Sequence, residues 1–255
     1  MRGRGTITAI GAALGGLTDL VYPPTCALCG APGADGLDLC AGCRADLPGI
    51  GPCCARCALP LPGPGASGRS GQAAPDRLCG PCQRHPPPFD HCHAPFRYED
   101  PLPALIAGLK FRGRLHLLRL LGALLARSLS DAGGELPALI VPVPLHPQRL
   151  RRRGYNQALE LARVAGRVLE LPVDSDCCSR VLATRPQADL DQKARRRNLR
   201  GAFRVTAAGE ARLAGRHVAI LDDVVTTATT VGELARALRQ AGCARVDVWA
   251  IARTP

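Results

Sequence analysis

The amino-acid sequence predicts an α/β protein in which a parallel sheet has helices on both faces and follows a small cysteine-rich region. From residue 94 onward, hydrophobic segments typical of strands alternate with segments of helical periodicity. Before that point, ten of the thirteen cysteines fall between Cys26 and Cys92, among many prolines and glycines. We therefore expect an N-terminal helix over 1–22, a cysteine-rich region over 23–90 and an α/β domain over 91–255.

Composition limits the partners. With 255 residues, of which 46% are hydrophobic, the chain can bury a sizeable core. A net charge of +12 favours acidic partners such as phosphorylated metabolites or nucleic acid. Only 3% of the residues are aromatic, which argues against an extended platform for stacking bases. No segment reaches the roughly 20 apolar residues of a membrane span, so we expect no span and a cytoplasmic location.

The first expected element is a short amphipathic helix, because Ile10, Leu14, Leu17 and Val21 recur at helical spacing. Polar residues interrupt this segment, which argues against a signal peptide. In the α/β domain we expect a strand that ends near Tyr98 and a helix after the sequence RGYNQ. The other expected elements are helices over 102–111, 115–129 and 231–241, and strands over 138–144, 217–223 and 245–252.

Four C-x-x-C pairs dominate the cysteine-rich region: Cys26/Cys29, Cys40/Cys43, Cys54/Cys57 and Cys79/Cys82. Each pair presents two thiolates from one tight turn, and two pairs complete a tetrahedral zinc site. We therefore expect two structural zinc sites, although disulfides or redox pairs could have the same spacing. Pairing the first with the second and the third with the fourth closes the shorter loops. A crossed arrangement stays open, as does Cys53 in place of Cys54.

The remaining cysteines have simpler interpretations. His91, Cys92 and His93 are expected at the start of a strand, because both tetrahedral sites already have four ligands. Outside the cluster, Cys177, Cys178 and Cys243 are expected to be small buried residues.

The stretch AILDDVVTTATT, residues 219–230, predicts a ligand site. A hydrophobic strand delivers Asp222 and Asp223 at its carboxyl end, where open α/β sheets bind ligands. The hydroxyls of the following threonines and the first N–H groups of the next helix can donate to phosphate oxygens. Two carboxylates beside such a loop suit a phosphorylated ribose. Alternatively, the acids form an ordinary turn and the threonines cap the helix.

Several motifs together carry a family resemblance. Residues 219–230 resemble the 5-phosphoribosyl 1-diphosphate (PRPP) motif of type I phosphoribosyltransferases. The segments LKFRG (109–113), VPVPLHPQRLRRRGYNQ (141–157), RRRNLRGAF (195–203) and VWAIART (248–254) resemble the competence protein F (ComF) family, also seen in proteins named GntX. The resemblance covers nearly the whole chain. It implies a type I phosphoribosyltransferase fold after a double zinc ribbon, with PRPP bound together with Mg²⁺.

The resemblance also implies roles for individual residues. Asp222 and Asp223 would hold the ribose 2- and 3-hydroxyls. The 5-phosphate would lie in a loop formed by Thr226, Thr227, Ala228, Thr229 and Thr230. A diphosphate loop would consist of Val143, Pro144 and Leu145, with Arg149, Arg153 and Asn156 nearby. A mobile hood would include Arg195, Arg196, Arg197 and Asn198.

One departure from the family pattern is Ala228, which stands where the family has glycine. An alanine at this point either adopts an ordinary backbone conformation or strains the loop by about 1 kcal/mol.

Two functions are compatible with these features. The first is a phosphoribosyltransferase that acts by positioning and electrostatics and needs no covalent nucleophile. The second is a non-catalytic adaptor or single-stranded DNA-binding module with the same fold, in contact with DNA-uptake proteins. The basic runs near 149–153 and 195–200 could attract a diphosphate or a nucleic-acid backbone, or could simply be solvated surfaces.

Overall fold

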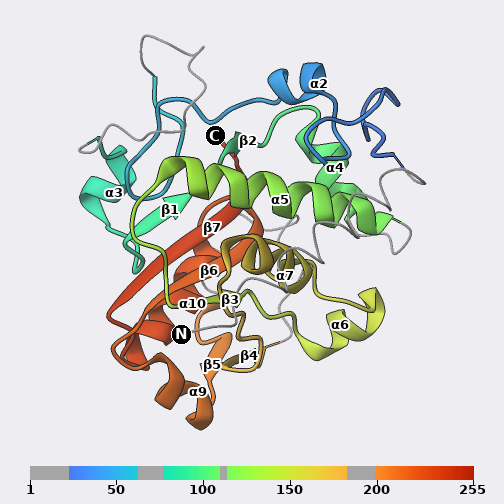
Figure 1. Ribbon diagram of the computed structural model, residues 1–255. Coiled ribbons are helices and arrows are strands. Elements are labelled where there is room, and N and C mark those ends of the chain that lie inside the picture. The colour runs from blue at the N-terminus through green and yellow to red at the C-terminus, as the bar shows by residue number, and fades with distance from the viewer. Residues whose placement is uncertain (1–22, 63–76, 110–113, 183–198) are drawn as a thin grey trace, which may run out of the picture. The chain divides into compact units, whose positions relative to one another are not determined.

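The computed structural model describes residues 23–62, 77–109, 114–182 and 199–255 (Figure 1). The chain divides into two compact units, Met1–Leu47 and Pro48–Pro255. Three sequence-based expectations lie outside the described residues: the N-terminal helix over 1–22, Lys110 of the LKFRG motif, and the hood residues 195–198. The first unit contains α2 (Ala41–Ala45), and all other described elements belong to the second.

The second unit contains more helices and strands than the sequence predicts. Its helices are α3 (Gly80–Arg84), α4 (Leu102–Gly108), α5 (Leu115–Ala132), α6 (Pro147–Arg153), α7 (Gln157–Leu169), α9 (Ala207–Leu213) and α10 (Thr229–Gln240). Its strands are β1 (His91–His93), β2 (Phe96–Arg97), β3 (Leu139–Pro142), β4 (Cys178–Arg180), β5 (Phe203–Val205), β6 (His217–Val225) and β7 (Arg245–Arg253). Of these, α3, α6, α9 and the antiparallel pair β4–β5 have no counterpart among the predicted elements.

The main sheet is parallel throughout, as expected. Its strand order is β1-β7-β6-β3, and β2 also pairs with β7. Eight of the nine residues of β7 are buried, which explains the nearly continuous hydrophobic run in its sequence. Strand β3 ends at Pro142, earlier than predicted. Pro144 has no N–H group with which to continue the ladder.

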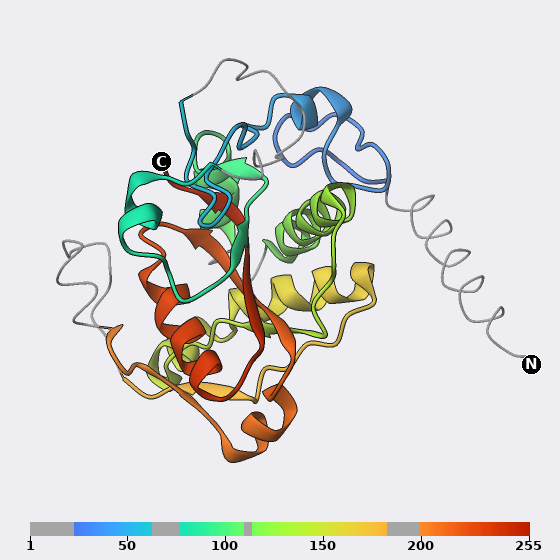
Figure 2. The ribbon, with the colours of Figure 1, turned by 90° about the vertical axis from the view of Figure 1, so that its left-hand side faces the viewer.

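Helices cover both faces of this sheet, which confirms the predicted architecture. α10 contacts β6 and β7 from one side, and α7 packs on β3 and β6 from the other, together with α5 (Figure 2). α7 and α10 are both amphipathic and turn their apolar residues toward the sheet. Because the strands are parallel, the loops that follow β3 and β6 emerge at the same edge of the sheet.

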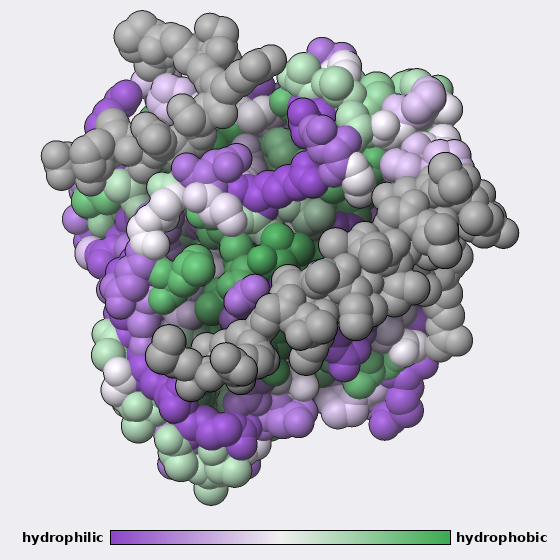
Figure 3. Space-filling view, viewed as in Figure 1, coloured by the Kyte–Doolittle hydropathy of each residue, from purple (hydrophilic) through white to green (hydrophobic). Residues whose placement is uncertain are grey.

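Charged residues lie mostly at the surface. On the face drawn in Figure 3, a group of hydrophobic residues lies beside bands of hydrophilic residues. Among the described residues, only five polar or charged side chains are buried: His93, Gln157, Arg180, Asp247 and Arg253. No helix in the described part of the chain is long and apolar enough to cross a membrane. The two buried arginines need a specific explanation, because a buried cation must find polar partners.

Candidate functional site

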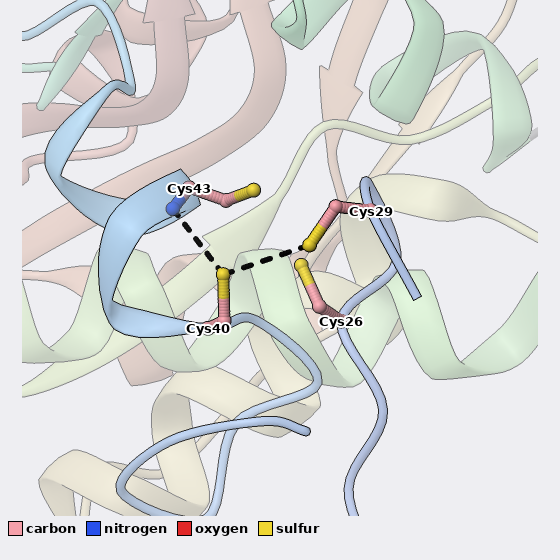
Figure 4. Close-up of side chains that lie close together, drawn as sticks. All are labelled: Cys26, Cys29, Cys40 and Cys43. Carbon is pink, nitrogen blue, oxygen red and sulfur yellow. Dashed lines mark hydrogen bonds between the residues drawn. The ribbon is translucent and has the colours of Figure 1, made fainter. Parts of the chain in front are cut away.

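Four cysteines converge in the first unit: Cys26, Cys29, Cys40 and Cys43 (Figure 4). Their sulfur atoms all lie within 4.8 Å of one another, and the Sγ atoms of Cys29 and Cys40 are 3.7 Å apart. Cys40 caps the short helix α2 and accepts a hydrogen bond from the Cys43 amide at 3.4 Å. The first and second C-x-x-C pairs therefore form one site, as sequential pairing predicts.

The second set of cysteines repeats this arrangement in the second unit with Cys54, Cys57, Cys79 and Cys82, all of them buried. The Sγ atoms of Cys57 and Cys79 are 3.6 Å apart, and the Cys79 amide donates to Cys54 Sγ at 3.3 Å. Burial alone would raise the pKa of the Cys54 thiol, but amide donors lower it to about 7. Cys53 lies outside the cluster, so Cys54 is the member of that pair that faces the other three sulfurs.

Both clusters fit zinc. Four thiolates about 2.3 Å from a tetrahedral ion would be about 3.8 Å apart, close to the sulfur separations seen here. The two ribbons also share their backbone pattern. Gly30 and Ala58 follow the first C-x-x-C pair of each ribbon with φ values of +76° and +54°. The chain therefore has two Cys₄ zinc-binding sites.

A cavity of about 370 Å³ lies at the edge of the sheet where β3 and β6 end. It brings together most of the ligand-binding residues that the sequence predicts. The predicted residues in its lining are Val143, Leu145, Arg149, Arg153, Asn156, Asp222, Asp223, Thr226, Ala228, Thr229 and Thr230. Pro144 is not part of the lining, and Thr227 lines a neighbouring cavity instead. The hood residues 195–198 lie outside the described residues.

The loop after β6 is shorter than predicted. β6 continues past the acid pair to Val225, and α10 begins at Thr229, so only residues 226–228 connect them. Thr229 and Thr230 thus form the first turn of the helix. Ala228 is the N-cap residue and has no side-chain acceptor for the first N–H groups of α10. These groups and the nearby hydroxyls leave the start of α10 rich in donors.

Ala228 adopts φ +57° and ψ +10°, in the left-handed region. Of the two alternatives left open by the sequence, the structure therefore has the strained one. The loop keeps a backbone conformation suited to glycine although alanine occupies the position.

Asp222 and Asp223 lie next to each other on the cavity side of β6. The Asp223 amide donates to Asp222 Oδ1 at 2.9 Å, and the Val224 amide donates to Asp223 Oδ1 at 2.8 Å. Burial, followed by the charge of Asp223, raises the pKa of the Asp222 carboxyl well above its usual range. The pair therefore holds a proton more readily than a carboxyl in water, and its remaining oxygens can accept hydrogen bonds.

Three arginines line the same cavity as this acid pair: Arg149 and Arg153 of α6, and Arg180 of β4. Arg180 is only 6% exposed and lies over the Phe203 ring, 5.6 Å from its centroid. Its pKa is lowered by burial and then by the charge of Arg149, whereas Asp222 raises it. Burial and neighbouring arginines likewise lower the pKa of Arg149. This concentration of positive charge favours an anionic ligand.

Asn156 has a structural position at the edge of the cavity. It caps α7 by accepting from the Ala158 amide at 3.1 Å, and its own amide donates to the Val143 carbonyl at 3.0 Å. It thereby fixes the loop after β3 to the start of α7. Two helix N-termini, those of α7 and α10, consequently border the same cavity.

Sequence reasoning missed Arg180. Nothing near it in the sequence indicates a ligand site, because it lies on a three-residue strand far along the chain from both loops. Its burial, together with that of Cys178, follows the alternation of a strand, but three residues are too few for that pattern to be recognised.

Comparison with known proteins places the chain in a family. Residues 17–83 match the double zinc ribbon domain. A protein named DNA utilization protein YhgH from Escherichia coli (strain K12) is 41% identical over 180 residues, which cover 69% of this chain and 78% of that protein. Competence protein F from Haemophilus influenzae is 34% identical over 219 residues, covering 84% of this chain and 90% of that protein. The chain belongs to the competence protein F family. The predicted family membership is thus confirmed. This competence protein F homologue has two Cys₄ sites.

Solved structures with a similar backbone are more distant from this competence protein F homologue. Glutamine PRPP amidotransferase from B. subtilis, complexed with ADP and GMP, has 18% identity and a TM-score of 0.35, covering 52% of this chain and 26% of that chain. The protein TT1426 from Thermus thermophilus has 21% identity and a TM-score of 0.32, covering 54% of this chain and 83% of that one.

Proposed function

We propose that this protein binds PRPP, or a related phosphoribosyl nucleotide, in the cavity at the edge of the sheet. One observation carries the proposal. The lining of this cavity combines an acid pair and a donor-rich loop with three arginines. A phosphorylated ribose with a diphosphate needs acceptors for its hydroxyls and donors for its anionic groups, and this cavity offers both.

Each group has a proposed partner on the ligand. Asp222 and Asp223 accept from the ribose 2- and 3-hydroxyls. Residues 226–230 donate to the 5-phosphate through hydroxyls and the N–H groups at the start of α10. Arg149, Arg153 and Arg180 neutralise the diphosphate, and Mg²⁺ bound together with PRPP would supply further positive charge. Asn156 keeps the loop after β3 in place.

The same arrangement suits phosphoribosyl transfer. The bond from C1 of the ribose to the diphosphate breaks, and the diphosphate leaves with the electron pair. A nucleophilic acceptor then forms the new bond to C1. The protein stabilises the departing charge with fixed arginines and holds the sugar by its hydroxyls. No covalent nucleophile of the protein is needed.

A link to competence and DNA uptake is part of the proposal, because relatives are named competence protein F and DNA utilization protein. So is a cytoplasmic location. All thirteen cysteines lie among the described residues and none forms a disulfide, which suits a reducing compartment.

The second candidate function is a non-catalytic adaptor or single-stranded DNA-binding module. The exposed Arg151 and Arg152 of α6 favour it.

Calorimetric titration with PRPP and Mg²⁺ tests the proposal. The wild-type protein should bind, and the double variant Asp222→Asn with Asp223→Asn should bind at least about a hundredfold more weakly, since each substitution replaces an acceptor oxygen by an NH₂ group that cannot accept. Asp176→Asn, which alters an exposed acid outside the cavity, is the matched control and should bind like the wild type.

Unchanged affinity in the double variant would disprove the ribose assignment. Absence of PRPP binding to the wild type would favour the second candidate, provided that the protein binds single-stranded DNA with an affinity that falls steeply as salt is added.

A further inference from the structure

Arg253, at the carboxyl end of β7, contacts two separate segments of the second unit as well as the next residue, Thr254. Its Nε donates to the carbonyl of Cys57, one of the second set of cysteines, at 3.1 Å. Its Nη1 lies 3.2 Å from the carbonyl oxygen of Val225 and also donates to that of Thr226. The same nitrogen lies 2.6 Å from the Thr254 carbonyl oxygen. One guanidinium thus joins the second ribbon to the loop that precedes α10.

The surroundings of Arg253 explain why it stays there. It is only 6% exposed, and the partners described for it are carbonyl oxygens and one hydroxyl. A buried cation balanced only by carbonyl dipoles requires those dipoles to stay in position. Movement of any one segment therefore disturbs the hydrogen bonds to the others.

The ribbon and the loop also line one cavity. This cavity, of about 1240 Å³, has Cys57, Cys79 and Cys82 of the ribbon and residues 226–229 of the loop in its lining. Arg253 belongs to the same lining. Thr226, Ala228 and Thr229 belong to the linings of both cavities. Arg253 is a direct hydrogen-bonded link between this loop and the second Cys₄ site.

A second arginine joins the ribbon region to the sheet without touching the loop. Arg239 of α10 donates to Asp90, whose carbonyl accepts from Arg56 of the ribbon at 3.5 Å. Asp90 also accepts from the Val246 amide at 2.9 Å. Arg239 donates in addition to the carbonyls of Cys243 and Ala244. It resembles Arg253 in its carbonyl partners and so provides a matched control.

We propose that Arg253 is a positioning residue through which zinc at the second Cys₄ site holds the loop of residues 225–230 in its binding conformation. Metal ligation maintains the turn that contains Cys57, because a small ribbon depends on its metal for folding. The Cys57 carbonyl then orients the guanidinium, which holds the Val225 and Thr226 carbonyls. The consequence for ligand affinity rests on the proposed function, whereas the consequence for loop order does not.

Hydrogen exchange of the full chain, read from peptides that cover residues 224–231, tests the link without a ligand. Cys82→Ser, which removes a ligand of the second site, should speed exchange in this loop at least about tenfold. Cys43→Ser, which removes a ligand of the first site, should not. Arg253→Lys keeps the charge but cannot reach both the ribbon and the loop. It should reproduce the effect of Cys82→Ser while the protein retains two zinc ions, whereas Arg239→Lys should leave the loop unchanged.

PRPP titration of the same variants gives the second readout. Arg253→Lys should bind about tenfold more weakly than the wild type and Arg239→Lys should not, because only the first loses hydrogen bonds to the loop. The inference would be overturned if the loop of the Cys82→Ser variant exchanged at the wild-type rate. It would also be overturned if the two arginine variants had the same loop exchange rate and the same PRPP affinity. If the Cys82→Ser variant exchanges rapidly throughout the chain, the test rests on loop exchange in Arg253→Lys, which retains its zinc. If the loop exchanges faster in Cys82→Ser and Arg253→Lys but the wild type does not bind PRPP, the proposed function is refuted and this inference still holds.

Discussion

Two alanines, Ala58 and Ala228, occupy left-handed backbone positions with φ values of +54° and +57°. Ala58 follows the third C-x-x-C pair, whereas Ala228 lies in the loop before α10. In the conformation described, the strain at Ala228 is already present before any ligand binds. It therefore lowers folding stability rather than ligand affinity.

Ala228→Gly should stabilise the protein by up to about 1 kcal/mol, because glycine removes the left-handed strain while adding some unfolded-state entropy. PRPP affinity should change less than about threefold. Denaturant unfolding and calorimetry measure the two effects, and Ala58→Gly is the control that should raise stability without touching the cavity. A large gain in affinity from Ala228→Gly would instead mean that the alanine methyl group obstructs the phosphate.

Asp222 gives a pH-dependent prediction, because burial and the charge of Asp223 raise its pKa in the folded protein. The folded state then holds this proton more tightly than the unfolded state, so ionisation of Asp222 destabilises the fold as pH rises above its ordinary pKa near 3.9. Asp222→Asn should therefore have a higher Tm than the wild type at pH 7, by about 2–4 °C for each kcal/mol relieved. The difference should vanish below about pH 3.5. Asp176→Asn should show no such gain, and a lower Tm for Asp222→Asn at pH 7 would contradict the assignment.

At the scale of elements, the loop after β3 and the helix α7 depend on one side chain. Asn156 bonds to both, through the Val143 carbonyl and the Ala158 amide. The helix thereby gains a cap, and the cavity gains a fixed wall. Arg149 and Arg153 belong to the same cavity lining as Val143 and Asn156.

Asn156→Ala should lower stability by about 1 kcal/mol through loss of the cap. It should also weaken PRPP binding about tenfold, because the loop after β3 loses its tether. Thr206→Ala provides the comparison. Thr206 caps α9 by accepting from the Gly209 amide at 3.0 Å, and it lies outside the cavity. Both variants should unfold more easily, but only Asn156→Ala should lose affinity. Equal binding by the two would show that Asn156 serves only as a cap.

At the scale of the whole molecule, the parts predictable from sequence are those with a local pattern. The C-x-x-C spacing indicates the zinc sites because each pair of ligands lies on one turn. The hydrophobic runs of β6 and β7 indicate a parallel sheet because both faces of these strands are covered. The helix α6 could not be predicted from hydrophobic periodicity, because four of its seven residues are arginines and it has no apolar face.

The positions of Arg180 and Arg253 could not be predicted for a different reason. Each owes its role to segments that only the fold brings together: Arg180 to Arg149 and Asp222, and Arg253 to Cys57 and Val225. A single sequence records no trace of such contacts. The acid pair and its loop were recognisable because their chemistry is contained in one short stretch.

The strand order also determines when the sheet can be completed during synthesis. β7 lies between β1 and β6, yet among the described strands it is the last to be made. A chain still emerging from the ribosome therefore carries β1 and β6 without the strand that joins them, and both expose unpaired edges. The zinc ribbons precede this point and can bind their metal first. For a nascent chain, this order makes the interval before residues 245–253 emerge the period of greatest exposure to aggregation and to chaperones.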